Sequence, residues 1–172
     1  MNITLSAPSP ALLPALGQLY LDSFPPEERR PWPQIAAGTA RPALLCASAA
    51  GEEAAGLVSL WRFPGFTYIE HLCTQPAMRG SGIGAEILRL LAAEGPPLLL
   101  EVEHPKGPGS IEQRRIDFYR RNGFRLLDYD YVQPPYAPGL PSVPLLLMST
   151  DPALDPSLAA RTLHREVYST VQ

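Results

Sequence analysis

The stretch MRGSGIGAEIL, residues 78–88, places glycines at alternate positions, Gly80, Gly82 and Gly84, directly before an amphipathic run. A β-rich run, FTYIEHLCTQ, precedes it, so the pattern predicts a strand, a glycine turn and a helix. N–H groups at a helix N-terminus have no intrahelical acceptor and carry partial positive charge, and glycine lets an anion approach the backbone closely. With Arg79 at its rim, the turn is predicted to bind a diphosphate. A plain tight turn is the alternative interpretation of so short a pattern.

The segments around this turn alternate between β-rich and helical patterns. We expect strands within residues 2–7, 41–63 (two strands joined by a turn at Gly51–Glu53), 66–75, 97–104, 124–132 and 142–150. We expect helices within residues 9–23, 83–94 and 110–122 and from 155 onward, and a short helix that ends at Ile35. A strand, helix and strand in succession require a parallel crossover, so the predicted class is mixed α/β. One domain is expected over residues 1–150, and a tail helix over 151–172 packs on it or forms a dimer contact.

Composition excludes several classes of protein. The chain has 172 residues, 45% of them hydrophobic and 18% charged, which is typical of a globular domain rather than a disordered one. Its net charge of −3 and its single lysine, Lys106, do not suit a nucleic-acid surface. Cys46 and Cys73 are predicted to be small buried apolar residues, because their spacing fits neither a disulfide framework nor a metal site. With neither a signal-peptide pattern nor a long apolar run, we expect a cytoplasmic protein that binds no membrane.

Two motifs together resemble a known family. The stretch IEHLCTQPAMRGSGIGAEIL, residues 69–88, is similar to motif A of the GCN5-related N-acetyltransferase (GNAT) family, whose core is Arg/Gln-x-x-Gly-x-Gly/Ala. The stretch FYRRNGF, residues 118–124, resembles the family's later helix motif, and the strand LLLEVE lies between the two. The resemblance covers most of residues 44–150. It implies a mostly antiparallel central sheet with flanking helices and a splayed pair of fourth and fifth strands.

The resemblance also implies a cosubstrate and its site. The cosubstrate would be acetyl-CoA, with no metal, and the reaction would be direct transfer of the acetyl group to a primary amine of a small molecule. The turn would bind the pyrophosphate through Arg79, Gly80, Ser81, Gly82, Ile83 and Gly84. The end of the fourth strand would pair with the pantetheine arm through Leu72, Cys73 and Thr74, and one N–H there would donate to the thioester oxygen.

Two side chains are candidates for acid–base chemistry. Glu70 matches a position where several relatives carry a glutamate that acts as a base through water, and a strand glutamate paired with an arginine is the alternative. Tyr119 matches the family tyrosine that protonates the departing thiolate. Its alternative is a core aromatic, for which the neighbouring Phe118 is the better candidate. Strand alternation predicts that His71 faces away from Glu70, as a histidine with satisfied partners or partial exposure.

The acceptor is less constrained. Glu101 and Glu103 lie two residues apart on one strand and, with Glu70, Asp128 and Asp130, could form an acidic region suited to a cationic amine. Solvated strand ends are the alternative. The loop YVQPPYAPGLP, residues 131–141, could form a pocket wall with Tyr131 and Tyr136, or could be a stiff connection. His104 is a further candidate substrate contact, and an acyl-enzyme on Cys73 is disfavoured because the family transfers directly.

Other functions remain open at this point. A protein N-terminal or lysine acetyltransferase would need an open groove in place of a closed pocket. A non-catalytic CoA-binding sensor on the same scaffold would not need Glu70 or Tyr119. The expected partner is a small-molecule amine, and a homodimer is left open.

Overall fold

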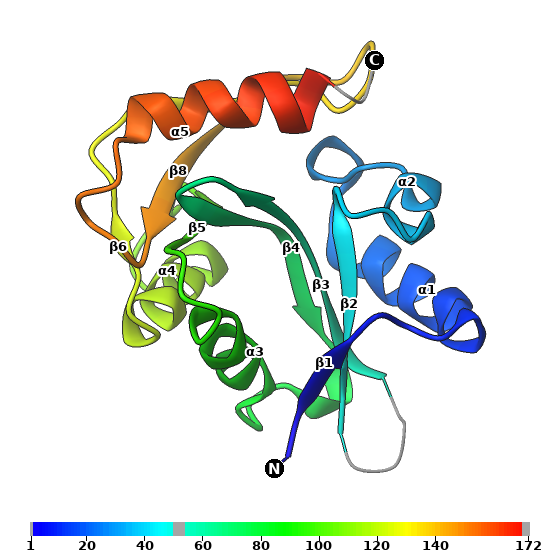
Figure 1. Ribbon diagram of the computed structural model, residues 1–172. Helices are drawn as coiled ribbons and strands as arrows, with labels where there is room; N and C mark the ends of the chain where they lie inside the picture. Colours follow the sequence, from blue (N-terminus) through cyan, green and yellow to red (C-terminus); the bar gives the residue numbers. More distant parts are fainter. Residues whose placement is uncertain (1, 50–53, 170–172) are drawn as a thin grey trace. The chain divides into compact units, whose positions relative to one another are not determined.

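The structure is a computed structural model that describes residues 2–49 and 54–169. The chain divides into two units, residues 1–96 and 97–172, each with its own sheet strands and helices. Figure 1 labels these elements along the chain.

The first unit is built on four antiparallel strands in the order β1 (Thr4–Ser6), β2 (Ala43–Ser48), β3 (Ala54–Phe63) and β4 (Phe66–Thr74). The short strand β1 pairs with β2 at the edge, as its alternating sequence predicts. The predicted turn at Gly51–Glu53 lies outside the described residues. The helices of the first unit are η1 (Pro10–Leu12), α1 (Leu13–Ser23), η2 (Pro26–Glu28), α2 (Trp32–Ala36), η3 (Pro76–Met78) and α3 (Ile83–Ala92).

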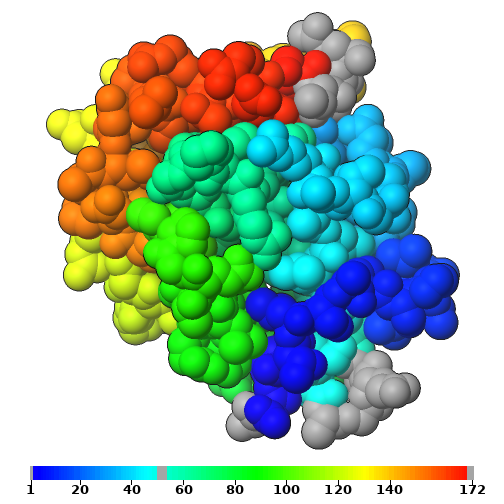
Figure 2. Space-filling model, viewed as in Figure 1, coloured from blue at the N-terminus to red at the C-terminus, as the bar shows by residue number. Residues whose placement is uncertain are grey.

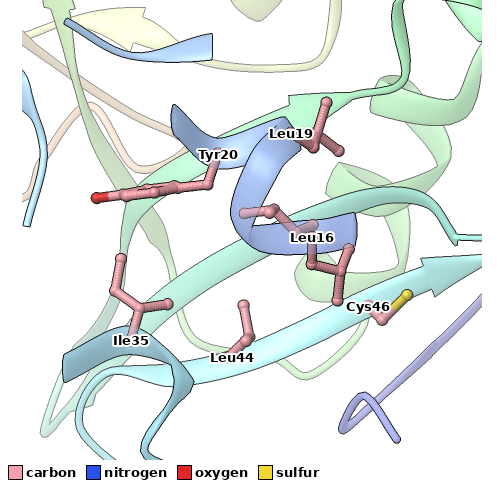
Figure 3. Close-up of a cluster of buried hydrophobic side chains, with 7 residues drawn as sticks. Leu16, Leu19, Tyr20, Ile35, Leu44 and Cys46 are labelled. Carbon is pink, nitrogen blue, oxygen red and sulfur yellow. The ribbon is translucent and has the colours of Figure 1, made fainter. Parts of the chain in front are cut away.

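A hydrophobic cluster fixes α1 and α2 on this sheet. Pro14 lies in the first turn of α1, where its missing N–H costs no helical hydrogen bond. The buried members of the cluster, six of them labelled in Figure 3, are Leu16, Leu19, Tyr20, Ile35, Leu44, Cys46 and Leu57. Each fully buried side chain of this kind stabilises the fold by about 1.5–3 kcal/mol. Figure 1 shows α1 and α2 on one side of β2–β4 and α3 on the other.

The second unit is built around β8 (Val143–Ser149), with which β5 (Leu98–Glu103), β6 (Arg125–Leu126) and β7 (Tyr131–Gln133) each pair antiparallel. The single strand predicted over residues 124–132 is wrong, because it is split into β6 and β7. The Leu127 N–H donates to the Leu147 carbonyl and Tyr131 lies opposite Leu145, so residues 128–130 face one residue of β8 and bulge out of the ladder.

The helices of the second unit are α4 (Ile111–Arg121), α5 (Pro156–Thr162) and the π-helix η4 (Leu163–Tyr168). Ser110 caps α4 by accepting from the Gln113 N–H, and Gly123 follows the helix at φ +91°, which agrees with the helix predicted within residues 110–122. Ile111 is the first residue of α4 and is exposed, whereas Ile116 and Tyr119 form the buried face of the helix. Leu158 is exposed on α5, whereas Leu163 and Val167 are buried.

Every strand pair within either unit is antiparallel, and helices flank the strands of both. The predicted mixed α/β class with a mostly antiparallel sheet is therefore confirmed. Within the described part of the chain, none of the helices combines the length and the apolar character that a membrane crossing requires.

Candidate active site

The glycine turn connects β4 to α3 as the sequence predicts. Gly80 has φ +80° and Gly82 has φ +87°, and α3 begins directly afterwards at Ile83. No protein atom lies within 4 Å of the position that a Cβ would take on either glycine. The left-handed backbone, and not packing, therefore requires glycine here. The Ile83 side chain is buried and fixes the start of the helix.

The turn presents several backbone donors. Over residues 2–49 and 54–169, the N–H groups of Gly80, Gly82, Ile83 and Gly84 make no hydrogen bond. Ser81 is different, because both its N–H and its hydroxyl donate to the Met78 carbonyl, at 3.4 and 2.5 Å. Arg79 is exposed beside these amides. Convergent N–H groups at a helix N-terminus with a neighbouring guanidinium fit a diphosphate.

The end of β4 offers its backbone rather than its cysteine. Leu72, Cys73 and Thr74 lie opposite Val58, Leu57 and Gly56 of β3. The Cys73 side chain packs against the cluster around α1, and burial raises the pKa of its thiol to about 11. A thiol with that pKa is almost entirely protonated at neutral pH and is a weak nucleophile.

A β-bulge on β4 places Glu70. Ser59 lies opposite His71 and Leu60 lies opposite Ile69, so Glu70 is the extra residue of the bulge. Its carboxylate accepts a hydrogen bond from Arg30 Nε at 3.0 Å and another from Trp61 Nε1 at 2.8 Å. The side chains of Glu70 and Arg30 are 0% and 1% exposed. We call Arg30, Trp61 and Glu70 the Glu70 cluster. This cluster matches the alternative that the sequence left open for Glu70, a strand glutamate paired with an arginine.

The predicted orientation of His71 is wrong. Its Nδ1 lies 3.1 Å from Ser59 Oγ, while Glu70 contacts Trp61, and Ser59 and Trp61 share one face of β3. His71 and Glu70 therefore face the same side, because the bulge interrupts the alternation of β4. His71 Nε2 lies 3.0 Å from the Glu28 carbonyl and 3.3 Å from the Tyr20 hydroxyl, so the prediction of a satisfied histidine is confirmed. Burial lowers the pKa of His71, partly offset by the negative charge of Glu70.

Tyr119 lies on α4 with its ring against two phenylalanines. Its ring centroid is 5.2 Å from that of Phe118 and 5.5 Å from that of Phe124. Tyr119 is 8% exposed, whereas Phe118 is only half-buried, so the expectation that Phe118 is the core residue of the pair is wrong. Ser110 caps the N-terminus of the helix that carries this ring. After the helix, the Phe124 N–H donates to the Tyr119 carbonyl at 3.1 Å.

The structure also shows a cluster that the sequence did not reveal. The Tyr168 hydroxyl of η4 donates to the Glu101 carboxylate, 2.7 Å from each oxygen, and the Tyr131 hydroxyl donates to Glu101 Oε1. Burial, and next the negative charge of Glu101, raises the pKa of Tyr131. We call Glu101, Tyr131 and Tyr168 the Glu101 cluster. Its one sequence signal is an acidic residue inside the apolar strand LLLEVE.

The other predicted acidic residues do not join this cluster. Glu103 pairs with Arg115 at 2.6 Å, and Glu70 pairs with Arg30. Asp128 and Asp130 are exposed on the bulge between β6 and β7, and His104 is exposed after β5. Among the described residues, no group of three or more histidines, cysteines and acidic residues could hold a metal ion.

Comparisons with known proteins identify the family. The model of the GNAT acetyltransferase domain matches residues 42–126. A solved structure named "Putative acetyltransferase from GNAT family" from Bacteroides thetaiotaomicron is 32% identical, with a TM-score of 0.80 over 96% of this chain and 98% of that one. The chain therefore belongs to the GNAT family of acetyltransferases. The prediction of this family and the prediction that the protein is an acyltransferase are therefore confirmed.

Two further matches are less similar. "Putative acetyltransferase YjbC" of Bacillus subtilis (strain 168) is 30% identical over 63 residues, which are 37% of this chain and 33% of that protein. The match thus spans about a third of the length of that relative. The crystal structure of an aminoglycoside 6'-N-acetyltransferase complexed with coenzyme A shares the fold at 17% identity, with a TM-score of 0.62 over 90% of this chain and 100% of that one.

Proposed function

We propose that the protein transfers the acetyl group of acetyl-CoA directly to a primary amine of a small molecule. The observation that carries this proposal is the turn at residues 79–84. It presents four free N–H groups and an arginine beside the start of a ten-residue helix. The family membership and the coenzyme A complex of the aminoglycoside acetyltransferase support the choice of cosubstrate. The aminoglycoside named for that enzyme supports a small-molecule amine as the acceptor.

Acetyl-CoA would supply a thioester, whose thiolate has a pKa near that of cysteine, about 8.5, and leaves readily. In this proposal the amides of Gly80, Gly82, Ile83 and Gly84 bind the diphosphate, and the Arg79 guanidinium adds a charge-assisted hydrogen bond. The backbone of Leu72, Cys73 and Thr74 binds the pantetheine arm and directs one N–H to the thioester oxygen. Direct transfer fits the protonated state of the Cys73 thiol.

Proton transfer completes the proposed mechanism. An alkyl ammonium with a pKa of about 10.4 must lose a proton before it attacks, which costs roughly 4–5 kcal/mol at pH 7. Tyr119 is proposed as the donor to the departing thiolate, a role that general acids fill with a gain of about 10²–10⁴ in rate.

Glu70 has two roles open to it under this proposal. As a base it would accept the proton of the amine through water, and as an anchor it would hold Arg30 on the bulge of β4. The anchor is favoured because the Glu70 side chain is 0% exposed and its carboxylate accepts from Arg30 and Trp61. A pH–rate profile of Glu70→Gln separates the two roles. Loss of the acidic limb indicates a base, and an unchanged limb with lower stability indicates an anchor.

The two free thiols, Cys46 and Cys73, fit a reducing compartment, so the proposal places the enzyme in the cytoplasm.

A turnover assay tests the proposed function. Acetyl-CoA is incubated with the protein and a panel of amines, amino acids and peptides, and release of free thiol is measured. We expect thiol release with at least one small primary amine and much slower release with peptides. Fast release with peptides alone would indicate a protein acetyltransferase. Coenzyme A binding without thiol release on any acceptor would indicate a sensor and would overturn the proposal.

A further inference from the structure

The end of β4 lies directly against one glycine of β3. Gly56 is buried in the strand, and its φ is outside the left-handed region. A glycine inside a strand weakens it, because it has no side chain to pack, and it often marks a close approach of another backbone. A Cβ on Gly56 would lie 2.6 Å from the Cys73 carbonyl oxygen and 3.2 Å from Thr74 Cα. Contact with the backbone of β4, and not conformational freedom, therefore requires glycine at this position.

The register of β3 and β4 explains why the two backbones are so close. Gly56 lies opposite Thr74 in the antiparallel ladder. Beside this pair, the Gln75 N–H donates to the Ala55 carbonyl at 2.9 Å. That bond makes Gly56 and Thr74 a non-hydrogen-bonded pair, in which the two Cα atoms lie only about 4.5 Å apart. A side chain on Gly56 would have to fit into this narrow spacing.

The same register shows which amides of β4 face away from β3. In an antiparallel ladder the N–H and C=O of one residue point to the same side, and successive residues alternate between the two sides. Because Gly56 and Thr74 form a non-hydrogen-bonded pair, the Thr74 N–H points away from β3, as does the Leu72 N–H two residues earlier. The Cys73 N–H instead faces Leu57 of β3. Leu72 and Thr74 therefore direct their amides to the side on which a bound arm could lie along β4.

Gly56 can influence a bound molecule only through β4. Leu57 and Cys73 pack in the cluster around α1, so Gly56 and Thr74 face the other side of the sheet, which α3 covers. Figure 2 shows the surface of α3, in green, beside the teal surface of β3 and β4. Gly56 is buried and belongs neither to β4 nor to the turn at residues 79–84. Its effect on a ligand is therefore one of position and not of direct contact.

We propose that Gly56 is a positioning residue for the acetyl group: its close contact with β4 fixes the amides of Leu72 and Thr74 where the pantetheine arm of acetyl-CoA pairs with them. This inference rests on the proposed function, because it concerns the same cosubstrate. An alanine at residue 56 must separate the two strands by several tenths of an ångström, since real Cβ atoms essentially never lie within 3.0 Å of such an atom. Hydrogen bonds need donor–acceptor distances of about 2.7–3.2 Å, so this displacement weakens the pairing with the arm.

A matched pair of probes measures the contribution of the arm alone. ADP carries the diphosphate, and dephospho-coenzyme A is the same molecule with the pantetheine arm attached. The ratio of their Kd values, measured by calorimetry on the full chain, is the gain in affinity that the arm provides. In Gly56→Ala we expect this gain to fall by about tenfold, as the loss of one or two backbone hydrogen bonds produces, while the Kd of ADP stays unchanged. An unchanged gain in folded Gly56→Ala would overturn the inference.

The same variant should slow the chemical step. A misplacement of reacting groups by about 1 Å can cost about 10²-fold in rate, so a smaller displacement in Gly56→Ala should lower kcat by about tenfold. Gly17→Ala is the matched control, because its Cβ would lie 2.8 Å from Trp32 Nε1 and strain a buried contact outside the proposed site. It should lower the free energy of unfolding and leave the gain from the arm and kcat unchanged. An equal loss of the gain in both variants would show general destabilisation and overturn the inference.

A second variant loosens the end of β4 without a clash. Gln75 has φ −52° and ψ 132°, which a proline before Pro76 can adopt. Gln75→Pro removes the N–H that donates to the Ala55 carbonyl and is expected to fold, whereas the control Gln75→Ala keeps this N–H. We expect the gain from the arm to fall by about threefold in Gln75→Pro, as the loss of one hydrogen bond loosens the strand end, and to stay unchanged in Gln75→Ala. If Gly56→Ala does not fold, an unchanged gain in Gln75→Pro overturns the inference.

These measurements separate the inference from the proposed function. If amines release thiol from acetyl-CoA but the gain from the arm is the same in the wild type and Gly56→Ala, the inference fails and the proposed function stands. If no amine releases thiol although the gain falls as expected, the proposed function fails and Gly56 remains a positioning residue for bound coenzyme A. Equal Kd values for ADP and dephospho-coenzyme A in the wild type would show that β4 does not bind the arm and would overturn the inference.

Discussion

Glu70 and Glu101 are both strand glutamates, but their surroundings differ. The side chain of Glu70 is completely buried and its charge is matched by that of Arg30. Glu101 is partly buried and accepts hydrogen bonds from the neutral hydroxyls of Tyr131 and Tyr168. The guanidinium of Arg30 offsets the charge of Glu70, whereas the two tyrosines orient the carboxylate of Glu101 through hydrogen bonds.

The difference teaches that the partners of a carboxylate, and not its residue type, decide how much its loss costs the fold. A buried ion pair stabilises a fold only while both partners are present, because removal of one leaves an uncompensated charge. A carboxylate that accepts from neutral hydroxyls depends on hydrogen bonds instead, and its replacement by an amide keeps an acceptor for them.

The largest expected effect separates the two clusters by stability. Glu70→Gln leaves the Arg30 guanidinium buried without its charge partner and should lower the free energy of unfolding by about 3–5 kcal/mol. Glu101→Gln keeps an acceptor for the tyrosine hydroxyls and should lower it by only about 1–2 kcal/mol. Urea denaturation of both variants measures the difference. Equal losses would mean that the two glutamates have the same structural role.

Tyr119 belongs to neither cluster, so a variant of Tyr119 tests the proposed proton transfer separately from the two clusters. Tyr119→Phe removes the proposed proton donor and should lower kcat by about 10²-fold or more, with little change in acetyl-CoA affinity. Tyr129→Phe is the matched control, because it removes a hydroxyl from a tyrosine to which no role is assigned. Steady-state kinetics at saturating amine measures both, and a wild-type kcat in Tyr119→Phe would exclude the residue from the mechanism.

A pH titration of stability distinguishes the clusters in another way. His71 is buried next to the Glu70 cluster, and burial lowers its pKa below the usual 6.5. Between these two values the unfolded chain binds a proton that the folded chain does not, so the free energy of unfolding falls as the pH drops below about 6.5.

The slope from this one group is at most about 1.4 kcal/mol per pH unit. It should disappear in His71→Asn and persist in His104→Asn, a control at an exposed histidine. Urea denaturation between pH 5 and pH 8 gives the slopes. A slope that survives in His71→Asn would show that another group carries the pH dependence.

The smallest expected effect concerns Cys73. Because its thiol is protonated at neutral pH and packs against the core, Cys73→Ala should change kcat less than about twofold. A loss of more than 10²-fold in a folded variant would support an acyl-enzyme on this cysteine and contradict direct transfer.

Local patterns predicted most of the fold. The alternating residues of β1, the cap at Ser110 and the glycines of the turn act over a few residues, so sequence spacing reveals them. The bulge at Glu70 was not predictable in this way, because it depends on the register between β3 and β4. That one extra residue reversed the expected side of His71.

The candidate site was predicted only in part for a similar reason. The turn at residues 79–84 is continuous in sequence, and its glycines identify it. The Glu101 cluster joins residues from β5, β7 and the tail, with Glu101 and Tyr168 separated by 67 positions. Only tertiary structure brings such residues together, and Tyr168 lies beyond the region where the family resemblance was recognised.

The central claim is that the backbone amides around residues 80–84 bind the diphosphate of acetyl-CoA. Isothermal titration of coenzyme A into the wild type, Gly82→Val and Gly65→Val tests it most directly. Gly65 has φ +96° in the turn between β3 and β4, so Gly65→Val introduces similar backbone strain away from the site. We predict binding to the wild type and Gly65→Val and none to Gly82→Val. Absence of a binding heat in the folded wild type, or wild-type affinity in Gly82→Val, would contradict the claim.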